Sequence, residues 1–298
     1  MLEVICKEAR GNFVMLDKKI RIYNGATAIV TGGASGIGKA LSQELARRGC
    51  EVVLADIQID EAKYAATEIR AWGGKAQAIM LNVTDFSSVE KAVQETYTRT
   101  GRLDYIFNNA GIVIGGTADN FSIEDWNKII DINFRGVVNG IQATYPLMIA
   151  QGFGHIVNTA SMAGLIPNPL NAAYAATKHA VVGLSQSLRI EAAYLGVRVS
   201  VICPGVVRTP ILRGGECGAV KTKIPQEKLD EMWEELKPMD PVLFANKVLN
   251  DLAKNKAMII YPAWWKMLWF LNRFSFNMGS AFMNYRFGRI NKEYDIYK

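Results

Sequence analysis

The stretch TGGASGIG, residues 31–38, directly follows a β-like run, Thr27–Thr31, and precedes a helical run, Lys39–Arg48. Glycines allow a tight turn and let the backbone come close to a pyrophosphate, while a helix N-terminus offers free N–H groups to phosphates. The spacing G-x-x-x-G-x-G differs from the common dinucleotide fingerprint, and no G-K-[ST] follows, so this is not a P-loop. The stretch predicts a phosphate-binding turn between a strand and a helix.

Seven short runs rich in Val, Ile and Leu alternate with helical stretches and lack strict apolar–polar alternation. Strands buried on both faces of a parallel sheet have this pattern, and the intervening segments are long enough for crossover helices. We therefore expect an α/β fold with one doubly wound parallel sheet flanked by helices. The runs are Thr27–Thr31, Glu51–Ala55, Ala76–Asn82, Leu103–Phe107, His155–Thr159, Arg198–Ile202 and Met258–Tyr261.

Composition favours one large domain. Half of the 298 residues are apolar and 21% are charged, and neither a low-complexity linker nor a solenoid repeat interrupts the chain. We expect an N-terminal extension over residues 1–22, the main domain over 23–261 and a C-terminal tail over 262–298. Within the domain, the region of about 210–241 is irregular: its glycines precede an amphipathic helix near Gln226–Lys237, and the region is a candidate lid.

Cysteine and histidine usage bounds the chemistry. The four cysteines form no C-x-x-C pair, which fits reduced thiols and a cytoplasmic location. Only two histidines occur, so a His-rich metal site is excluded and no metal is expected. The first ten residues carry charges and lack the apolar core of a signal peptide, and no stretch of 18 apolar residues supports a spanning helix.

Asp56 stands at the end of the second run, eighteen residues after Gly38. A carboxylate at this position can accept hydrogen bonds from both adenosine ribose hydroxyls and would repel a 2′-phosphate. Neither Ala34, Ser35 nor Ile57 supplies a compensating cation. The sequence therefore predicts NAD as the cofactor in preference to NADP; the alternative is a surface Asp that caps the following helix.

Tyr174 and Lys178 lie four residues apart, with Ser161 thirteen residues upstream of the tyrosine. On a helix, residues i and i+4 share a face, so the phenol and the ammonium can lie side by side. A phenol titrates near ~10, and a neighbouring cation lowers that pKa by favouring the ionised form. The pair is thus a candidate general acid/base near neutral pH.

From Asn24 to Tyr261 the chain resembles the short-chain dehydrogenase/reductase family, because several motifs occur in that family's order. They are T-G-x-x-x-G-x-G at Thr31–Gly38, N-N-A-G at Asn108–Gly111, the helix asparagine Asn133, the serine Ser161, Y-x-x-x-K at Tyr174–Lys178, and P-G at Pro204–Gly205 followed by Thr209. The resemblance implies a Rossmann-type sheet with strand order 3-2-1-4-5-6-7. It also implies hydride transfer between a nicotinamide ring and an alcohol or carbonyl carbon.

The resemblance also implies residue roles. Tyr174 would exchange a proton with the substrate oxygen, Lys178 would depress the phenol pKa and hold the nicotinamide ribose, and Ser161 would hydrogen-bond the substrate oxygen. Asn133 would hold a water linking Lys178 to solvent. The cofactor would contact Gly32, Ser35, Gly36, Ile37, Gly38, Asp56, Asn82, Val83, Asn109, Ala110, Gly111, Tyr174, Lys178, Pro204, Gly205, Val207 and Thr209.

Three departures from the family pattern stand out. Asn82 replaces an Asp that in many members holds the adenine amino group; its side-chain oxygen can still accept that bond. The N-terminal leader is about twenty residues longer than the minimum, and Met15 is a possible internal start. The third departure is the C-terminal tail.

The tail contains PAWWKMLWFLNRFSF at residues 262–276, and residues 257–298 carry a net charge of +4 out of the total +6. At ~100° per residue, an apolar side formed by Trp264, Met267, Leu268, Leu271 and Phe274 opposes Lys266 and Arg273, with Trp265, Trp269 and Phe270 on the flanks. This pattern predicts peripheral contact with a membrane on its cytosolic face. The alternative is that the stripe packs on the domain or on a partner subunit.

The expected substrate is a small lipophilic alcohol, or its ketone or aldehyde, such as a long-chain, retinoid-like or steroid-like alcohol. The expected pocket wall is apolar: Val113, Ile114, Met162, Leu165, Ile166, Val206, Ile211 and Leu212. Family members commonly form dimers and tetramers through the helices near Glu124–Ala150 and Asn171–Leu195, which implies a homodimer or homotetramer. No nucleic-acid motif accompanies the basic charge.

Two other functions remain open from the sequence. A nucleotide-sensing scaffold that lost catalysis should lack at least one of Asn133, Ser161, Tyr174 and Lys178, and all four are present. A nucleotide-sugar dehydratase or epimerase would carry a larger C-terminal substrate domain than this chain has room for. The direction of the reaction is not encoded.

Overall fold

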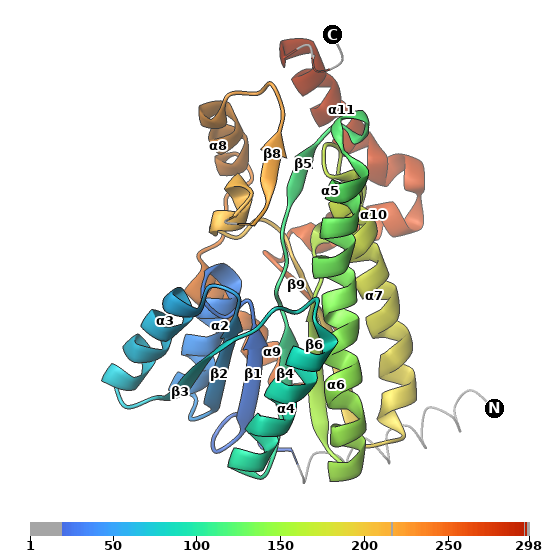
Figure 1. Ribbon diagram of the computed structural model, residues 1–298. Coiled ribbons are helices and arrows are strands. Elements are labelled where there is room, and N and C mark those ends of the chain that lie inside the picture. Colours follow the sequence, from blue (N-terminus) through green and yellow to red (C-terminus); the bar gives the residue numbers. More distant parts are fainter. Residues whose placement is uncertain (1–19, 216, 295, 297–298) are drawn as a thin grey trace, which may run out of the picture.

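The computed structural model describes residues 20–215, 217–294 and 296, drawn in colour in Figure 1. The expected N-terminal extension lies outside the described residues as far as position 19, and so do Cys6 and Met15. Ile20, which falls inside that expected extension, is buried in the core.

The centre of the molecule is a seven-stranded parallel sheet formed by β1 (Thr27–Thr31), β2 (Glu51–Asp56), β3 (Lys75–Met80), β4 (Tyr105–Asn108), β6 (Gly154–Thr159), β7 (Val197–Pro204) and β9 (Met258–Tyr261). Its spatial order is β3-β2-β1-β4-β6-β7-β9. Counting only these seven strands, the order is 3-2-1-4-5-6-7, which confirms the predicted α/β doubly wound fold. The labels run higher because β5 and β8 pair elsewhere.

Helices cover both faces of the sheet. One face packs against α2 (Gly36–Arg47), α3 (Ile59–Ala71) and α9 (Pro241–Ala253), and the other against α4 (Phe86–Thr100), α6 (Gly136–Gln151) and α7 (Ala172–Ala193). Successive residues of β1 serve opposite faces: Ala28 and Val30 join the first cluster and Ile29 the second. Double-sided burial explains why the strands lack apolar–polar alternation.

The edge strand β3 departs from that pattern. Each of its residues is exposed or half-buried, because β2 is its single neighbour in the sheet. β3 also ends at Met80, two residues before the predicted end. Asn82 Oδ1 accepts hydrogen bonds from the Thr84 backbone N–H (3.1 Å) and the Thr84 hydroxyl (2.9 Å), so the chain turns there instead of extending.

The remaining elements gather beyond the carboxyl ends of the strands. They are β5 (Ile114–Gly116), η1 (Ala118–Asn120), α5 (Ile123–Ile130), η2 (Asp131–Arg135), η3 (Met162–Gly164), η4 (Pro210–Arg213), β8 (Ala219–Lys221), α8 (Gln226–Glu234), α10 (Trp265–Phe274) and α11 (Phe276–Tyr294). Figure 1 shows β5, β8, α8 and α11 together above this edge of the sheet. β8 is a short strand inside the region of about 210–241 that was expected to be irregular. It pairs in parallel with β5.

The C-terminal tail is helical and packs on the domain through one side. Trp265 is buried in the core cluster, and Leu268 and Trp269 pack against it. The predicted helical wheel placed Trp265 and Trp269 on the flanks, but both meet the core. Leu268, from the predicted apolar side, also packs there, as the alternative of a stripe packed on the domain requires. Within the described ranges, no helix has the length and apolarity needed to cross a membrane.

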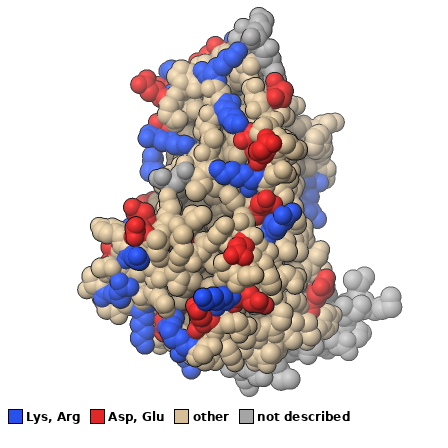
Figure 2. All heavy atoms as spheres, viewed as in Figure 1, with Lys and Arg blue, Asp and Glu red and all other residues tan. Residues whose placement is uncertain are grey.

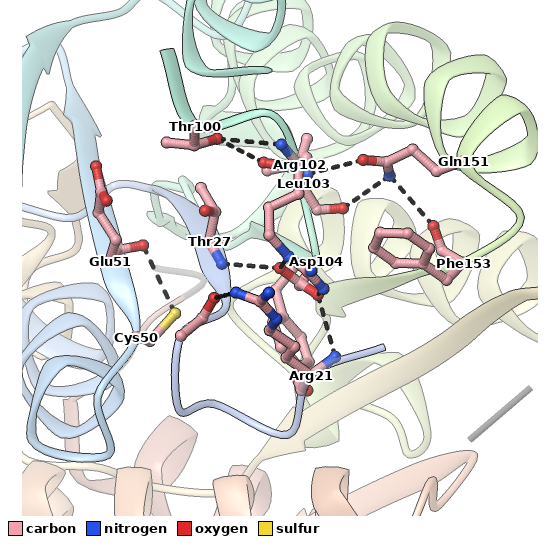
Figure 3. A network of polar contacts seen from close by, with 12 residues as sticks. Arg21, Thr27, Cys50, Glu51, Thr100, Arg102, Leu103, Asp104, Gln151 and Phe153 are labelled. Atoms are coloured by element: carbon pink, nitrogen blue, oxygen red, sulfur yellow. Dashed lines mark hydrogen bonds and ion pairs between the residues drawn. The ribbon is translucent and has the colours of Figure 1, made fainter. Parts of the chain in front are cut away.

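The amino end of the sheet is held by the buried carboxylate of Asp104, shown in Figure 3. Its oxygens accept hydrogen bonds from the backbone N–H of Thr27 (2.9 Å) and of Arg21 (3.2 Å), and it pairs with Arg102, whose Nε donates at 2.7 Å. In the same view, the Gln151 side chain bonds the N–H and C=O of Leu103. These contacts join β1, β4 and the chain entering the domain.

We expect Asp104→Ala to lower the free energy of unfolding by about 3 kcal/mol, because it leaves Arg102 without its acid and two backbone donors without an acceptor. Urea unfolding followed by circular dichroism measures the change. Asp119→Ala, at an exposed position in η1, serves as the control and should stay within about 0.5 kcal/mol of the parent. Equal effects of the two substitutions would contradict the role of Asp104.

Candidate active site

The glycine-rich loop closes tightly between β1 and α2. A Cβ on Gly38 would lie 1.9 Å from the Gly32 carbonyl oxygen, and a Cβ on Gly32, where φ is +64°, would lie 2.9 Å from the Ala110 Cα. No side chain fits at either position. The loop therefore brings the N-terminus of α2, with Ser35 as its N-cap, to the wall of a cavity, where Ser35, Gly36 and Ile37 are exposed to a ligand.

Hydrogen bonds tie this loop to the neighbouring strand ends. The Thr31 hydroxyl donates to the Phe107 carbonyl (3.2 Å) and accepts from the backbone N–H groups of Asn109 (2.9 Å) and Ala110 (3.1 Å). The Asn109 amide donates to the Thr31 carbonyl (3.1 Å), and its oxygen accepts from the Thr159 hydroxyl (3.3 Å). The ends of β1, β4 and β6 are thus joined where the cavity begins.

Asp56 is buried at the end of β2, so it is not the surface residue of the alternative interpretation. One carboxylate oxygen accepts from the Ala34 N–H (2.9 Å) and the other from the Gln58 N–H (3.0 Å). A carboxylate oxygen has two lone pairs, so each retains capacity for a ligand hydroxyl. Glu61, the next carboxylate along the cavity wall, was not anticipated from the sequence.

Asn82 and Val83 line the cavity at the same end. The Asn82 side-chain oxygen already accepts hydrogen bonds from Thr84, as described above. Thr84 therefore competes with the adenine amino group that was predicted to donate to this oxygen. Val83 is buried, and its carbonyl accepts from the Asn139 amide (2.8 Å). This bond holds the β3–α4 loop against α6.

Tyr174, Lys178 and Ser161 lie on the wall of the same cavity. Tyr174 and Lys178 come from the first two turns of α7, and Lys178 Nζ is 5.5 Å from the Tyr174 ring centroid. Lys178 donates to the Thr159 carbonyl at 2.8 Å. Ser161 follows β6 as the N-cap of η3; its hydroxyl accepts from the Ala163 N–H (3.1 Å) and contacts the Pro204 carbonyl (3.5 Å).

The prediction that Lys178 lowers the pKa of Tyr174 is wrong for this arrangement. Burial raises the pKa of Tyr174 to about 12, and its hydrogen bond with Ser161 only partly opposes the shift. Burial also lowers the pKa of Lys178 to about 8. The ammonium lies beside the ring and bonds the Thr159 carbonyl, so desolvation outweighs attraction between the two groups.

Asn133 is fully buried in η2, a π-helical turn between α5 and α6. Its side-chain oxygen accepts from the Ile112 N–H (2.8 Å) and its amide donates to the Ile112 carbonyl (2.9 Å) and to the Thr177 hydroxyl (3.4 Å). The side chain therefore clasps the loop after β4, and it does not line the cavity. The side chain that was predicted to hold a water is thus already hydrogen-bonded to Ile112 and Thr177. The π-helical turn itself is of a kind that often marks functional sites.

The loop after β7 forms another part of the wall. Pro204, Gly205, Val207 and Thr209 all line the cavity. The Gly205 N–H donates to the Tyr261 carbonyl (2.8 Å), and the backbone around Val207 pairs with Met239. Thr209 packs on the loop glycine Gly36, whose Cβ would lie 3.2 Å from it.

Most of these groups line one cavity of about 790 Å³. Sixteen of the seventeen residues expected to contact the cofactor line it; Gly38 does not, because it is enclosed by the loop itself. Of the expected apolar wall, Ile114 and Leu165 are absent: Ile114 is buried in a separate core cluster, and Leu165 packs on the core while its carbonyl accepts from Asn272.

The sequence predicted a candidate lid over about 210–241, but it did not identify the cavity-lining residues of α8, α10 and α11. Leu229, Met232, Trp233 and Leu236 line the cavity from α8 and its end, and Trp265, Met283, Arg286, Phe287 and Ile290 from the tail. Both sets contain the spacing i, i+3, i+4, i+7 of one helical face, which was the available signal. It shows that a face is covered, but not which part of the chain covers it.

The short chain dehydrogenase family model matches residues 26–216. The chain belongs to the short-chain dehydrogenase family. It is 38% identical over 239 residues to 2,5-dichloro-2,5-cyclohexadiene-1,4-diol dehydrogenase of Sphingobium indicum, covering 79% of this chain and 92% of that protein. It is also 38% identical over 192 residues to cyclohexanol dehydrogenase of an Acinetobacter species, covering 64% and 76%.

A comparison with solved structures supports the same family. A short chain dehydrogenase/reductase of Burkholderia phymatum in complex with NAD superposes with a TM-score of 0.78 at 26% identity, covering 87% of this chain and 96% of that one. The protein is accordingly an oxidoreductase of alcohols and carbonyls that uses a nicotinamide cofactor. The residues present fit such a cofactor, because the glycine cradle admits no Cβ and the α2 N-terminus and Asp56 share one wall.

Lys178 should make stability depend on pH. Its pKa is lowered to about 8 in the folded chain and returns to its usual higher value on unfolding. Between these values the unfolded chain binds more protons, so this group's contribution to stability rises with pH. We expect the free energy of unfolding of the parent, minus that of Lys178→Met, to rise by about 1 kcal/mol from pH 7 to pH 9.

Denaturant titrations at each pH measure this difference. Lys128→Met, at an exposed position in α5, is the matched control and should show no comparable pH dependence. A parallel pH dependence of the two variants would mean that the Lys178 ammonium is solvated rather than buried.

Proposed function

We propose that the protein interconverts a lipophilic primary or secondary alcohol and its aldehyde or ketone with NAD(H), using Tyr174 as the general acid/base. The observation that carries the proposal is the composition of this one cavity. Its lining combines two acidic groups at and after the end of β2 (Asp56 and Glu61), the three polar groups Ser161, Tyr174 and Lys178 just after β6 and on α7, and apolar side chains from α8 and the tail. A dinucleotide and an apolar substrate would meet at Tyr174.

The choice of NAD over NADP rests on the charges around Asp56. Two carboxylates, Asp56 and Glu61, line that end of the cavity, and the cations among the lining residues, Lys178 and Arg286, belong to other parts of it. Lys39, at the start of α2, pairs with Glu68 at 2.8 Å. A 2′-phosphate would face negative charge without a cation on the wall, whereas ribose hydroxyls can donate to Asp56.

In the proposed mechanism, the backbone around Val207 and the hydroxyl of Thr209 orient the nicotinamide, which supplies the hydride chemistry when bound. Tyr174, kept protonated by burial, donates its proton to the oxygen of a carbonyl substrate, and Ser161 donates a hydrogen bond to the same oxygen. Alcohol oxidation runs the same proton transfer in reverse: Tyr174 first gives its proton to neutral Lys178 and then accepts the proton of the alcohol.

Lys178 is proposed to hold the cofactor ribose and to pass protons to and from Tyr174. Because its pKa is about 8, Lys178 can gain and lose a proton near neutral pH, which Tyr174 with a pKa of about 12 cannot do alone. A water held beside η2, the turn that contains Asn133, would complete the route to solvent.

The apolar end of the cavity supports a lipophilic substrate. Met162, Ile166, Val206, Ile211 and Leu212 line it, as expected from the sequence. Relatives named for dichlorocyclohexadienediol and cyclohexanol act, by those names, on cyclic alcohols. Neutral ring or chain alcohols with large apolar bodies therefore fit this class.

We also propose that α10 rests on the cytosolic face of a membrane. With Trp265 and Trp269 turned to the core, the outward face carries Trp264, Met267, Phe270 and Phe274, the last 88% exposed. Exposed aromatic side chains grouped on one helix are typical of interfacial anchoring. Such contact would bring the pocket close to lipophilic substrates.

A homodimer or homotetramer remains part of the proposal. Ile190, Tyr194 and Leu195 form an exposed apolar group at the end of α7, in the region expected to meet a partner subunit. On the face shown in Figure 2, by contrast, Lys and Arg are interspersed with Asp and Glu, as on a solvated surface.

Tyr174→Phe tests the catalytic assignment. We expect a loss of kcat of about 10²- to 10⁴-fold, because the proton donor is removed, with NADH affinity within about twofold of the parent. Turnover is measured on alcohols of graded chain length and ring number with NAD⁺ and NADP⁺ in parallel, and NADH binding by fluorescence. Tyr194→Phe, at an exposed position, is the control.

Wild-type turnover by Tyr174→Phe would overturn the assignment. A parent that binds NADH and oxidises no member of the panel would favour the scaffold alternative. Equal kcat/KM with NAD⁺ and NADP⁺ would refute the preference attributed to Asp56 and Glu61.

Point substitutions test the membrane contact better than removal of the tail, because Trp265 is part of the core and of the cavity wall. We expect Phe270→Ser to weaken partitioning onto vesicles containing anionic lipid by about tenfold, since one buried Phe side chain contributes about 1.5–3 kcal/mol. Ile123→Ser, which exposes a similar apolar area on α5, should change nothing. Unaltered sedimentation of Phe270→Ser with vesicles rejects this part of the proposal.

A further inference from the structure

The C-terminal tail meets the loop after β7 at Trp265, the first residue of α10. The Trp265 side chain is buried in the core cluster and also lines the cavity, as do Gly205, Val207 and Thr209 of that loop. The family model ends at residue 216, so Trp265 lies outside the matched region. A residue of the tail thus borders the part of the wall where the nicotinamide is proposed to bind.

Trp265 lies directly against Gly205. A Cβ on Gly205 would lie 2.2 Å from the indole Nε1, 2.4 Å from Cδ1 and 2.8 Å from Cε2, so the five-membered part of the ring occupies the place of a side chain. Gly205 is not one of the glycines with a positive φ, so its backbone conformation would accept an alanine. The indole, and not the turn, is therefore what requires a glycine at this position.

Backbone hydrogen bonds restrain the same loop. The Gly205 N–H donates to the Tyr261 carbonyl at 2.8 Å. Met239 donates its N–H to the Val206 carbonyl (3.0 Å), and its own carbonyl accepts from the Arg208 N–H (2.9 Å). The indole adds a steric restraint, because it fills the space into which Gly205 would otherwise move.

The indole is itself held in place. The Trp264 ring stacks on it, with ring centroids 4.3 Å apart and an interplanar angle of 26°. Farther along α10, the Asn272 amide donates to the Leu165 carbonyl at 3.1 Å, which anchors the helix on the domain. The Trp265 Nε1–H has no hydrogen-bond partner among the described residues, so the ring acts on Gly205 through its shape.

We propose that Trp265 is a positioning residue for the cofactor: its indole fixes the loop after β7 in the position from which Val207 and Thr209 orient the nicotinamide. Gly205 stands two residues before Val207 and four before Thr209, so a displacement at the indole contact reaches both. This inference rests on the proposed function, which assigns those two residues to the nicotinamide. It adds that the tail, besides lining the substrate side of the cavity, is part of the cofactor site.

Binding of NADH and of ADP-ribose tests the proposal, because ADP-ribose lacks the nicotinamide ring and keeps the rest of the dinucleotide. We expect Trp265→Ala to weaken NADH binding by about tenfold, since the space left by the indole lets the loop shift, and to leave ADP-ribose binding within about twofold of the parent. Calorimetry on the full chain measures both affinities. At saturating NAD⁺, kcat for an alcohol that the parent oxidises should fall by about 10- to 100-fold, because hydride transfer depends on alignment.

Two variants separate positioning from general support of the fold. Trp269→Ala removes the same type of side chain one turn along α10, where it packs on the core but does not line the cavity. The ratio of NADH to ADP-ribose affinity should stay unchanged in this variant. Trp265→Phe keeps a flat ring against Gly205 and should recover most of the NADH affinity lost in Trp265→Ala, since the deleted N–H has no partner among the described residues.

A double substitution tests the contact itself. Gly205→Ala places a methyl group where the indole lies, so we expect it to weaken NADH binding by about tenfold in the parent. In the Trp265→Ala background the methyl group has room, and the added loss should be about twofold or less. Losses that simply multiply would mean that the two residues act independently, which contradicts the proposal.

The outcomes distinguish this inference from the proposed function. Equal losses for NADH and ADP-ribose in Trp265→Ala, no loss for either, or an unchanged kcat overturn the positioning role and leave the oxidoreductase proposal standing. The same holds if Trp269→Ala shifts the ratio equally, or if Trp265→Phe behaves like Trp265→Ala. A selective loss for NADH, in a protein whose parent oxidises no alcohol, supports the positioning role and counts against the reaction. A parent that does not bind NADH overturns both.

Discussion

The cavity depends on a chain of hydrogen bonds across the carboxyl ends of β1, β4 and β6. Thr31 is bonded to the backbone after β4, Asn109 links that backbone to Thr159 at the end of β6, and the Thr159 carbonyl holds Lys178. Parallel strands place these ends side by side, but they do not set how far apart the loops lie. The bonded side chains set that spacing, so the glycine-rich loop and Lys178 are held in one hydrogen-bonded framework.

Burial then determines the chemistry within this frame. The interior favours neutral forms, which raises the pKa of Tyr174 and lowers that of Lys178. In a free side chain the pKa of lysine is slightly above that of tyrosine, whereas here the pKa of Tyr174 is above that of Lys178. Of the two, the lysine therefore titrates nearer neutral pH. A phenol held neutral suits donation of a proton, and a lysine of this kind suits its resupply. Asn133 contributes by position, because its amide holds the loop after β4 instead of facing the cavity.

The tail connects the cavity with the surface. One side of α10 is buried against the loop after β7 and the other displays aromatic side chains, while α11 returns over the cavity and supplies part of its wall. The family model covers residues 26–216, so this wall is built from sequence outside the matched region. The matched region thus contains the glycine-rich loop and the Tyr–Lys pair, whereas the tail lies outside that match.

The strand order was implied by the family resemblance, whereas the sequence alone determined the doubly buried parallel strands, the glycine turn between β1 and α2 and the placement of Tyr174 and Lys178 on one helix face. These follow from local chemistry: apolar runs, glycines where no Cβ fits, and residues four apart on a helix. Only the tertiary structure decided the direction of the Tyr174 pKa shift, the partner of Asn133, the burial of Trp265 and the position of Arg286 over the cavity. Desolvation and packing depend on which distant segments come together, and no local pattern around Trp265 or Arg286 records what lies on the other side.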